Sequence, residues 1–353
     1  MSRASGLAIV ALAAAAVACA SGTASVEPPP PAARTLDAAD GADAPIAASP
    51  DGGGRDADVP IAAASRITRE MLETDLRVLA QPRNHTTAPA GLEAAARHIA
   101  TELEASGYTV ARAPVTFKKA HADNVIGEHR GTDGSRTLLV GGHYDAVPGT
   151  PGADDNASGV AAALAVARAL AAAPPMRATV RVVAFAFEEV GLVGSDAYAR
   201  SLSADDRSRI AAVINLDMVG FRSASPGTQL DPLDRARPKD ERKRLAADFI
   251  AVWAHPAARE TLTALGAARR FTPDLHVETM IVPEALLASA PDLIRSDHAS
   301  FWAVGVPAVS IVDTADARSP HYHKKTDTVE TLDLDFATSV ARWIAAAMIL
   351  LDG

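Results

Sequence analysis

Four almost uninterrupted apolar runs constrain the fold more than any other feature of this 353-residue chain. Strands that are apolar on both faces are typical of a parallel sheet covered by helices on both sides. Segments with apolar residues at helical spacing separate the runs, among them SGVAAALAVARALAA and the C-terminal DFATSVARWIAAAMILL. This alternation predicts one α/β domain, a three-layer sandwich with a mixed, mainly parallel central sheet. The four runs are RTLLVGGH (136–143), ATVRVVAFAF (178–187), IAAVINLD (210–217) and PAVSIVD (307–313).

Further elements are expected on either side of these runs. TREMLETDLRVLA (68–80) and AGLEAAARHIATELEASG (90–107) have helical spacing, whereas YTVARAPVTF and ADNVIGEHRG alternate like two paired strands. Between residues 221 and 294 the pattern weakens. There we expect a polar loop and a helix over LAADFIAVWAH (245–255), together forming an elaboration over the sheet that borders the substrate pocket.

The first residues read as an export signal. Arg3 precedes an apolar stretch over residues 7–18, which is shorter than the ~20 residues of a membrane-spanning helix and typical of a secretory signal. The only cysteine, Cys19, follows AVA, and this resembles a bacterial lipoprotein signal in which that cysteine is lipidated. Ordinary cleavage after an A-x-A site is the alternative. A single cysteine also excludes an intrachain disulfide.

Residues 20–66 are rich in Pro, Ala, Asp and Gly and lack apolar periodicity, which predicts a disordered tether. The expected organisation is a signal over residues 1–19, this tether, and a folded domain over residues 67–353. We therefore expect an exported protein. It would be either a lipoprotein anchored in a bacterial membrane, on the periplasmic or surface side, or a secreted protein.

The charge distribution argues against nucleic-acid binding. The net charge is −9, and the 34 basic residues form neither a run nor a stripe with interleaved aromatics. Proteins that bind nucleic acid gain affinity by neutralising phosphates with clustered cations. We therefore expect no nucleic-acid partner.

Acidic and histidine side chains stand at the ends of several predicted strands. Ligands of open α/β sheets collect outside the carboxyl ends of the strands. Each group alone has an ordinary structural interpretation, such as an H-x-D pair or a helix N-cap. Charge at the end of a buried strand costs several kcal/mol unless it is neutralised, so their convergence predicts a metal centre. The residues are His143, Asp145, Asp154, Asp155, Asn156, Glu188, Glu189, Asp217, His321 and His323.

Five motifs in order carry a specific resemblance. GGHYDAVPGTPGADDNASGV, FAFEEVGLVGS, NLDMVG, SDHASF and HKKTDT resemble the secreted dinuclear-zinc aminopeptidases of the bacterial leucyl aminopeptidase type. The related glutamate carboxypeptidases carry the same metal site. The resemblance spans roughly residues 67–353. It implies peptide substrates and two Zn²⁺ per chain.

The resemblance also implies the metal ligands. Asp155 would bridge both ions, because it stands four residues before Gly159 as the family's bridging acid does before its glycine. A cis peptide is expected after that acid. His323 is preferred to His321 because of its four-residue spacing to Asp327. His143 and Asp217 would complete one zinc site, and Glu189 and His323 the other.

Two further residues receive roles. Glu188 matches the family's general base, which takes a proton from water and hands it to the leaving amine. Asp145 lies two residues after His143 on an extended segment, so it can orient the imidazole ring. Residues 296–298 match the family's SDH motif, which supports the site from nearby. Consecutive residues cannot form a serine-hydrolase array.

Alternatives remain open at this point. A carboxypeptidase or dipeptidase would use the same metal site, and Arg222 and Arg295 are candidates to bind a substrate carboxylate. A glutaminyl cyclase-like enzyme shares the fold but keeps one zinc, and a binding protein on an inactive peptidase scaffold typically loses ligands. The complete set of five ligands favours hydrolysis.

Overall fold

An eight-stranded sheet organises the computed structural model, which describes residues 58–230, 245–283, 285 and 291–353. The strand order is β1-β2-β4-β3-β5-β8-β6-β7. Neighbouring strands β4, β3, β5 and β8 are parallel, whereas β1 with β2, β2 with β4, and β6 with β8 are antiparallel. The predicted mixed sheet is thus confirmed. The strands are β1 Thr109–Phe117, β2 Ala120–His129, β3 Thr137–His143, β4 Thr179–Phe185, β5 Ile210–Asp217, β6 Ile250–Ala254, β7 Val277–Ile281 and β8 Val309–Val312.

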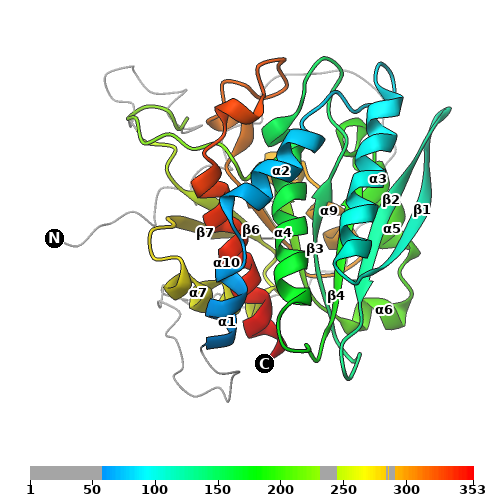
Figure 1. Ribbon diagram of the computed structural model, residues 1–353, viewed down its shortest axis with the longest axis vertical. Coiled ribbons are helices and arrows are strands. Elements are labelled where there is room, and N and C mark those ends of the chain that lie inside the picture. Colours follow the sequence, from blue (N-terminus) through cyan, green and yellow to red (C-terminus); the bar gives the residue numbers. More distant parts are fainter. Residues whose placement is uncertain (1–57, 231–244, 284, 286–290) are drawn as a thin grey trace, which may run out of the picture.

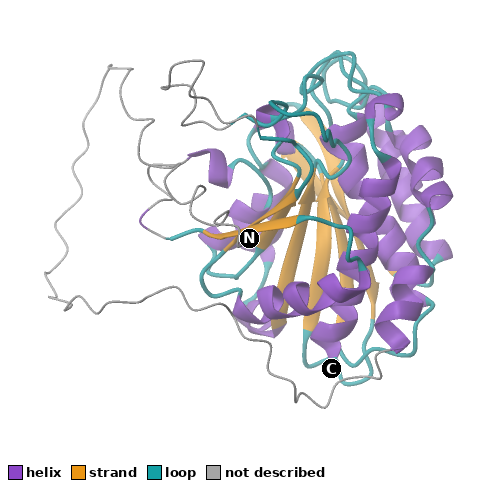
Figure 2. Ribbon diagram, turned by 90° about the vertical axis from the view of Figure 1, so that its left-hand side faces the viewer, coloured by secondary structure: helices purple, strands orange, loops and turns teal. Residues whose placement is uncertain are grey.

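Helices cover both faces of this sheet (Figures 1 and 2). Successive residues of a strand point to opposite faces, so Leu138 joins the larger core, under α4 and α10, and Leu139 joins a smaller core with Tyr198 of α5 and Phe301 of α9. This is the three-layer arrangement that the apolar runs predicted. The helices are α1 Asp58–Ser65, α2 Arg69–Leu79, α3 Pro89–Ala105, α4 Gly159–Ala171, α5 Val193–Ser201, α6 Ala204–Arg209, α7 Arg259–Ala268, α9 His298–Ala303 and α10 Leu334–Asp352.

Helix α10 is a core helix. Among the described residues it alone is long and apolar enough to cross a membrane, with a mean hydropathy of 1.5, but 78% of that window is buried inside the fold. Asp333 caps its N-terminus, and the carboxylate accepts the Phe336 N–H at 2.9 Å. Trp343 is fully buried and donates from its indole nitrogen to the Leu265 carbonyl at 2.8 Å.

The prediction of a helix over residues 245–255 is wrong. Residues 250–254 form strand β6, which pairs with β8 on one side and β7 on the other. The run IAVWA is buried on both faces of the sheet except for Trp253, so its apolar residues do not show the spacing of either a helix or a half-exposed strand. This region therefore adds strands to the edge of the sheet. We had expected it to form an elaboration that covers the sheet. Of the predicted polar loop, residues 231–244 lie outside the described residues.

The predicted tether is too long at its C-terminal end. Residues 58–65 form α1, which packs against α10 and buries Ala63 and Ala64. Alanine has high helix propensity, and Pro60 lies in the first turn, where the N–H that proline lacks would have no intrahelical partner. The folded part thus begins before residue 67. The rest of the predicted tether, the predicted signal and Cys19 lie outside the described residues.

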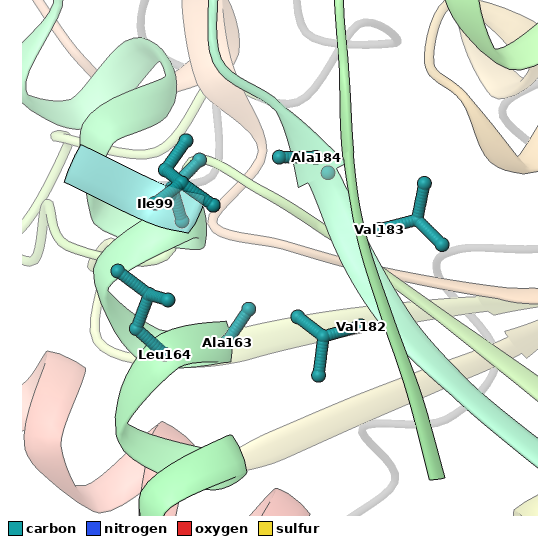
Figure 3. A pocket seen from close by; sticks show the side chains of 8 residues that line it. Ile99, Ala163, Leu164, Val182, Val183 and Ala184 are labelled. Carbon is teal, nitrogen blue, oxygen red and sulfur yellow. The ribbon is translucent and has the colours of Figure 1, made fainter. Parts of the chain in front are cut away.

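Small residues let the central strands approach closely. A Cβ atom on Gly142 of β3 would lie 2.1 Å from the carbonyl oxygen of Leu216 on β5. Gly142 also borders an apolar cavity of about 10 Å³ between α3, α4 and the sheet (Figure 3). A cavity of that size holds at most one water molecule, and its walls offer no polar partner. It is a packing defect and cannot hold a substrate.

Candidate metal centre

The five predicted metal ligands converge at one end of the sheet. His143 and Asp217 are the last residues of β3 and β5, and Glu189 lies in the turn Glu188–Val190 after β4. Asp155 lies in the turn Ala153–Ser158 that leads into α4, and His323 lies in the segment between β8 and α10. Figure 2 shows the loops gathered at this end of the strands.

Asp155 lies between the two histidines. Its Oδ1 is 3.4 Å from Nε2 of His143, and its Oδ2 is 3.1 Å from Nε2 of His323. Asp217 approaches the same His143 nitrogen to 3.4 Å, and Glu189 approaches the His323 nitrogen to 3.3 Å. Two three-residue groups of oxygen and nitrogen donors therefore share one carboxylate.

The buried carboxylates of this cluster form an environment that favours bound cations. Burial opposes protonation of His323, but Asp155 and Glu189 outweigh it and raise the pKa of His323 to about 10. Burial and the charge of Asp155 raise the pKa of Glu189 to about 7. One oxygen of Glu189 is buried without a hydrogen-bond partner among the described residues. Oxygen and imidazole donors in this arrangement fit zinc.

Glu188 and Glu189 both face the cluster, although adjacent residues of a strand point in opposite directions. Strand β4 ends at Phe185, and the chain turns at Phe187, whose φ is +61°. The short 3₁₀ turn that follows brings Oε2 of Glu188 to 3.9 Å from Nε2 of His143. Burial is the main cause that raises the pKa of Glu188 well above its ordinary value.

Asp145 has a larger role than the one predicted for it. Its carboxylate lies 3.7 Å from Nδ1 of His143, close enough to influence the ring, while the backbone carbonyl of Asp145 lies nearer, at 3.3 Å. The same carboxylate accepts the backbone N–H of Glu188 at 3.0 Å and of Glu189 at 3.4 Å. Asp145 therefore links β3 to the glutamate turn, and no spacing rule in the sequence reveals that contact.

The neighbouring acid Asp154 points away from the cluster. Its Oδ1 accepts hydrogen bonds from the Gly220 N–H and the Ser158 hydroxyl, at 2.9 and 3.1 Å. The peptide bond between Asp155 and Asn156 is cis, as the family resemblance implied. Asp155, and not Asp154, therefore faces the two histidines.

Asp327, four residues after His323, supports the turn that carries Asp155. Its carboxylate accepts the backbone N–H of Asp154 at 2.8 Å and of Asp155 at 3.1 Å. His321 instead contacts Thr326, 3.1 Å away, and lies edge-on to Phe221. His323, and not His321, therefore faces Asp155.

The SDH motif lies beside the cluster without forming a nucleophile. Ser296 accepts a hydrogen bond from Asn215 at 2.8 Å. The Nε2 atom of His298 contacts the Leu293 carbonyl at 2.8 Å, and burial lowers the pKa of His298 to about 4. Asp297 is fully buried, and its carboxylate has no hydrogen-bond partner among the described residues. The motif borders the site as expected.

The two arginine candidates have different partners. Arg222 pairs with Asp333 at 2.7 Å. Arg295 donates to the hydroxyl of Tyr322 at 2.7 Å, and the Tyr322 ring stacks on that of His323 with 3.8 Å between centroids.

Solved structures with this architecture include several aminopeptidases. The aminopeptidase from Aneurinibacillus sp. strain AM-1 superposes with a TM-score of 0.62 at 19% identity, over 82% of this chain and 95% of that one. The LapA aminopeptidase of Legionella pneumophila gives 0.65 at 18% identity, over 87% and 78%. A glutaminyl cyclase of Porphyromonas gingivalis gives 0.57 at 17%, over 83% and 97%. At these identities the likeness shows the fold.

Sequence relatives extend the comparison. The uncharacterized protein YfbL of Escherichia coli is 31% identical over 284 residues, which cover 75% of this chain and 82% of YfbL. The probable lipoprotein aminopeptidase LpqL of Mycobacterium tuberculosis is 29% identical over 245 residues, which cover 65% of this chain and 45% of LpqL. Residues 124–348 match the sequence model of peptidase family M28. The chain therefore belongs to peptidase family M28, and the prediction of a zinc metallopeptidase is confirmed at the level of the family.

Proposed function

We propose that the chain is a two-zinc exopeptidase that removes N-terminal residues from peptides. His143 and Asp217 would hold one ion, Glu189 and His323 the other, and Asp155 both. The observation that carries this proposal is that the two carboxylate oxygens of Asp155 face two different imidazoles, at 3.4 and 3.1 Å. A carboxylate so placed is suited to bridge two cations.

The charges of the cluster also support two ions. Asp155, Glu189 and Asp217 bring three negative charges when ionised, and the imidazoles bind metal in their neutral form. Two divalent cations would bring four positive charges, so the buried group would be nearly neutral. Zinc bound there would polarise the scissile carbonyl and lower the pKa of water from about 15.7 towards about 7.

Glu188 is the proposed general base. Its carboxylate lies at the edge of the donor cluster, 3.9 Å from the His143 ring, and Asp145 fixes its backbone. Glu188 would accept the proton of the attacking water and deliver it to the nitrogen of the leaving peptide as the scissile C–N bond breaks. Positioned bases of this kind contribute about 10²–10⁴-fold in rate.

An aminopeptidase is favoured over a carboxypeptidase or dipeptidase. Arg222, one of the two candidates for binding a substrate carboxylate, is paired with Asp333 and lies over the Phe336 ring. Arg295, the other candidate, already pairs with Asp292 and Asp316, at 3.4 and 3.3 Å. The relative LpqL and the solved neighbours from Aneurinibacillus and Legionella are named aminopeptidases. The five donor residues suffice to hold two ions, whereas a glutaminyl cyclase-like site holds one zinc. The donor set therefore favours hydrolysis over cyclisation.

We also propose that the protein is exported and attached to a membrane through a lipid on Cys19. The apolar stretch before that cysteine has the length of a signal, and the relative LpqL is named a probable lipoprotein aminopeptidase. Replacing Cys19 with alanine should release the protein from the membrane fraction of expressing cells. Equal membrane retention of both forms would argue against lipidation.

The activity is tested with a metal assay and a matched substrate panel. We expect about two zinc ions per chain, cleavage of Leu-Gly amide, and no cleavage of N-acetyl-Leu-Gly. A chelator should abolish the cleavage, and added zinc should restore it. One zinc per chain with cyclisation of N-terminal glutamine, or preferential cleavage of the N-blocked peptide, would overturn the proposal.

A further inference from the structure

Arg83 is a buried cation beside the candidate metal centre, and none of the roles described above uses it. It lies in the segment between α2 and α3 and is only 1% exposed. All of its hydrogen bonds go to backbone carbonyl oxygens. Within the described residues, no carboxylate oxygen lies within 4.0 Å of its guanidinium nitrogens. Burial lowers the pKa of Arg83, and the charges of nearby acids, Asp155 and Asp327 first, oppose this. A buried arginine without an ion-pair partner is uncommon and needs an explanation.

The guanidinium joins three separate segments of the chain. Its Nε donates to the Tyr144 carbonyl at 2.6 Å, directly after His143. Its Nη2 donates to the Gly152 carbonyl at 2.7 Å, three residues before Asp155, and Nη1 donates to the neighbouring Pro151 carbonyl. Nη1 also reaches the carbonyl of Leu79, the last residue of α2, at 2.8 Å.

The second of these segments is wrapped tightly around the guanidinium. Gly152 has a φ of +61°, and a Cβ atom there would lie 2.3 Å from the Asp155 carbonyl oxygen and 3.1 Å from Nη2 of Arg83. The Arg83 carbonyl in turn accepts the Ala146 N–H at 3.0 Å, so its backbone holds the segment after His143 as well.

We propose that Arg83 is a positioning residue of the metal centre, which sets the separation of His143 and Asp155 before a cation binds. The inference rests on the proposed zinc role of those two residues. The planar guanidinium can donate in three directions at once, whereas the three donors of a lysine share one nitrogen atom. Lysine therefore keeps the charge but cannot hold all three segments.

A purely structural arginine would change stability alone, and Arg168 provides the matched control. It is partly buried near the end of α4, and its guanidinium donates to Asp75 and Glu102. Replacing it with lysine removes a comparable network without touching the segments beside His143 and Asp155.

The experiment compares wild type, Arg83→Lys and Arg168→Lys. Zinc affinity is measured by competition with a chromophoric chelator, the geometry of the site by the visible absorption of the cobalt-substituted protein, and stability by thermal unfolding of the metal-free protein. We expect Arg83→Lys to bind zinc about 10–100-fold more weakly, with a changed cobalt spectrum. Arg168→Lys should unfold at a lower temperature with unchanged affinity and spectrum.

Wild-type zinc affinity and an unchanged cobalt spectrum in Arg83→Lys would overturn the inference. If Arg83→Lys folds only when metal is present, its refolding is measured as a function of zinc concentration. The comparison is an Arg168 variant that loses the same amount of stability. Equal dependence of refolding on zinc in the two variants would also overturn the inference. Failure of the wild type to bind zinc would sink the proposed function and this inference together. Failure at Arg83 alone leaves the proposed function standing.

Discussion

The carboxylate of Asp327 holds Asp155 through its backbone, accepting its N–H at 3.1 Å across 172 residues of sequence. The other oxygen of Asp327 accepts the N–H of Asp154 at 2.8 Å. Two charge-assisted hydrogen bonds thus fix the turn from which the proposed bridging carboxylate projects. The segment containing His323 and the turn containing Asp155 are thereby tied together.

Asp327→Asn is predicted to weaken zinc binding about 10–100-fold. The amide keeps one acceptor oxygen but replaces the other with an NH₂ donor, which cannot accept the second backbone N–H. Chelator competition measures the affinity. Asp333→Asn is the control, since Asp333 binds Arg222 and the start of α10. That variant should bind zinc like the wild type, and an equal loss of affinity in both would refute a specific role for Asp327.

Glu188→Gln is predicted to keep both zinc ions and to lower kcat by about 10²–10⁴-fold, since the amide cannot accept the proton. Zinc content and steady-state kinetics on Leu-Gly amide measure the two effects. Glu189→Gln should instead lower the zinc content, because Glu189 belongs to the donor group around His323. Wild-type turnover by the Glu188 variant would remove Glu188 from the mechanism.

The lowered pKa of Asp75 predicts that part of the free energy of unfolding depends on pH. Burial opposes its ionisation, but His98 and Arg168, at 3.0 and 2.6 Å, outweigh it and lower its pKa from 3.8. A lowered folded-state pKa stabilises the protein above the unfolded-state pKa, and this stability is lost as the pH falls through the folded-state pKa. Asp75→Asn should therefore cost about 3–5 kcal/mol near pH 7, and this cost should shrink below about pH 4.

Chemical denaturation of wild type and Asp75→Asn across this pH range measures the difference. Asp335→Asn is the matched control, because its ion pair with Arg69 is 3.3 Å long and exposed. That change should stay within about 0.5 kcal/mol at every pH. A cost at Asp75 that is constant with pH would contradict the expected linkage.

Gly142→Ala is predicted to destabilise the fold by about 1–3 kcal/mol, because its Cβ would lie 2.1 Å from the Leu216 carbonyl oxygen. Gly266→Ala in α7 should instead stabilise it by about 0.5–1 kcal/mol, since nothing lies within 4 Å and the helix backbone suits alanine. Urea unfolding of both variants tests the contrast. Destabilisation by both would point to a general loss of stability unrelated to strand spacing.

The sequence predicted the parts of the site that lie at the ends of apolar runs. His143 and Asp217 end such runs and the two glutamates directly follow one, and the parallel order of β4, β3 and β5 brings those ends together. The supporting contacts of Arg83, Asp145 and Asp327 were not predicted as such. These side chains contact backbone groups that are distant in sequence or lie across a turn. Because nearly every residue has the same backbone groups, the sequence does not mark which of them will be contacted.

The missed elements of the fold have a similar cause. Strand β6 is buried on both sides between β8 and β7, so its apolar residues show no single period. Strand β7 mixes Val277, Glu278 and Thr279 at the sheet edge, where half-exposed positions remove the alternation that a strand shows when one face is buried. Both assignments depend on neighbours that a local window does not contain.

The placement of one carboxylate between His143 and His323 limits how such a centre can be altered. Any substitution at the shared residue acts on both halves at once, so neither half can be tuned independently from there. In the proposed centre, independent adjustment falls to the residues that belong to one half alone, which are His143 and Asp217 on one side and Glu189 and His323 on the other.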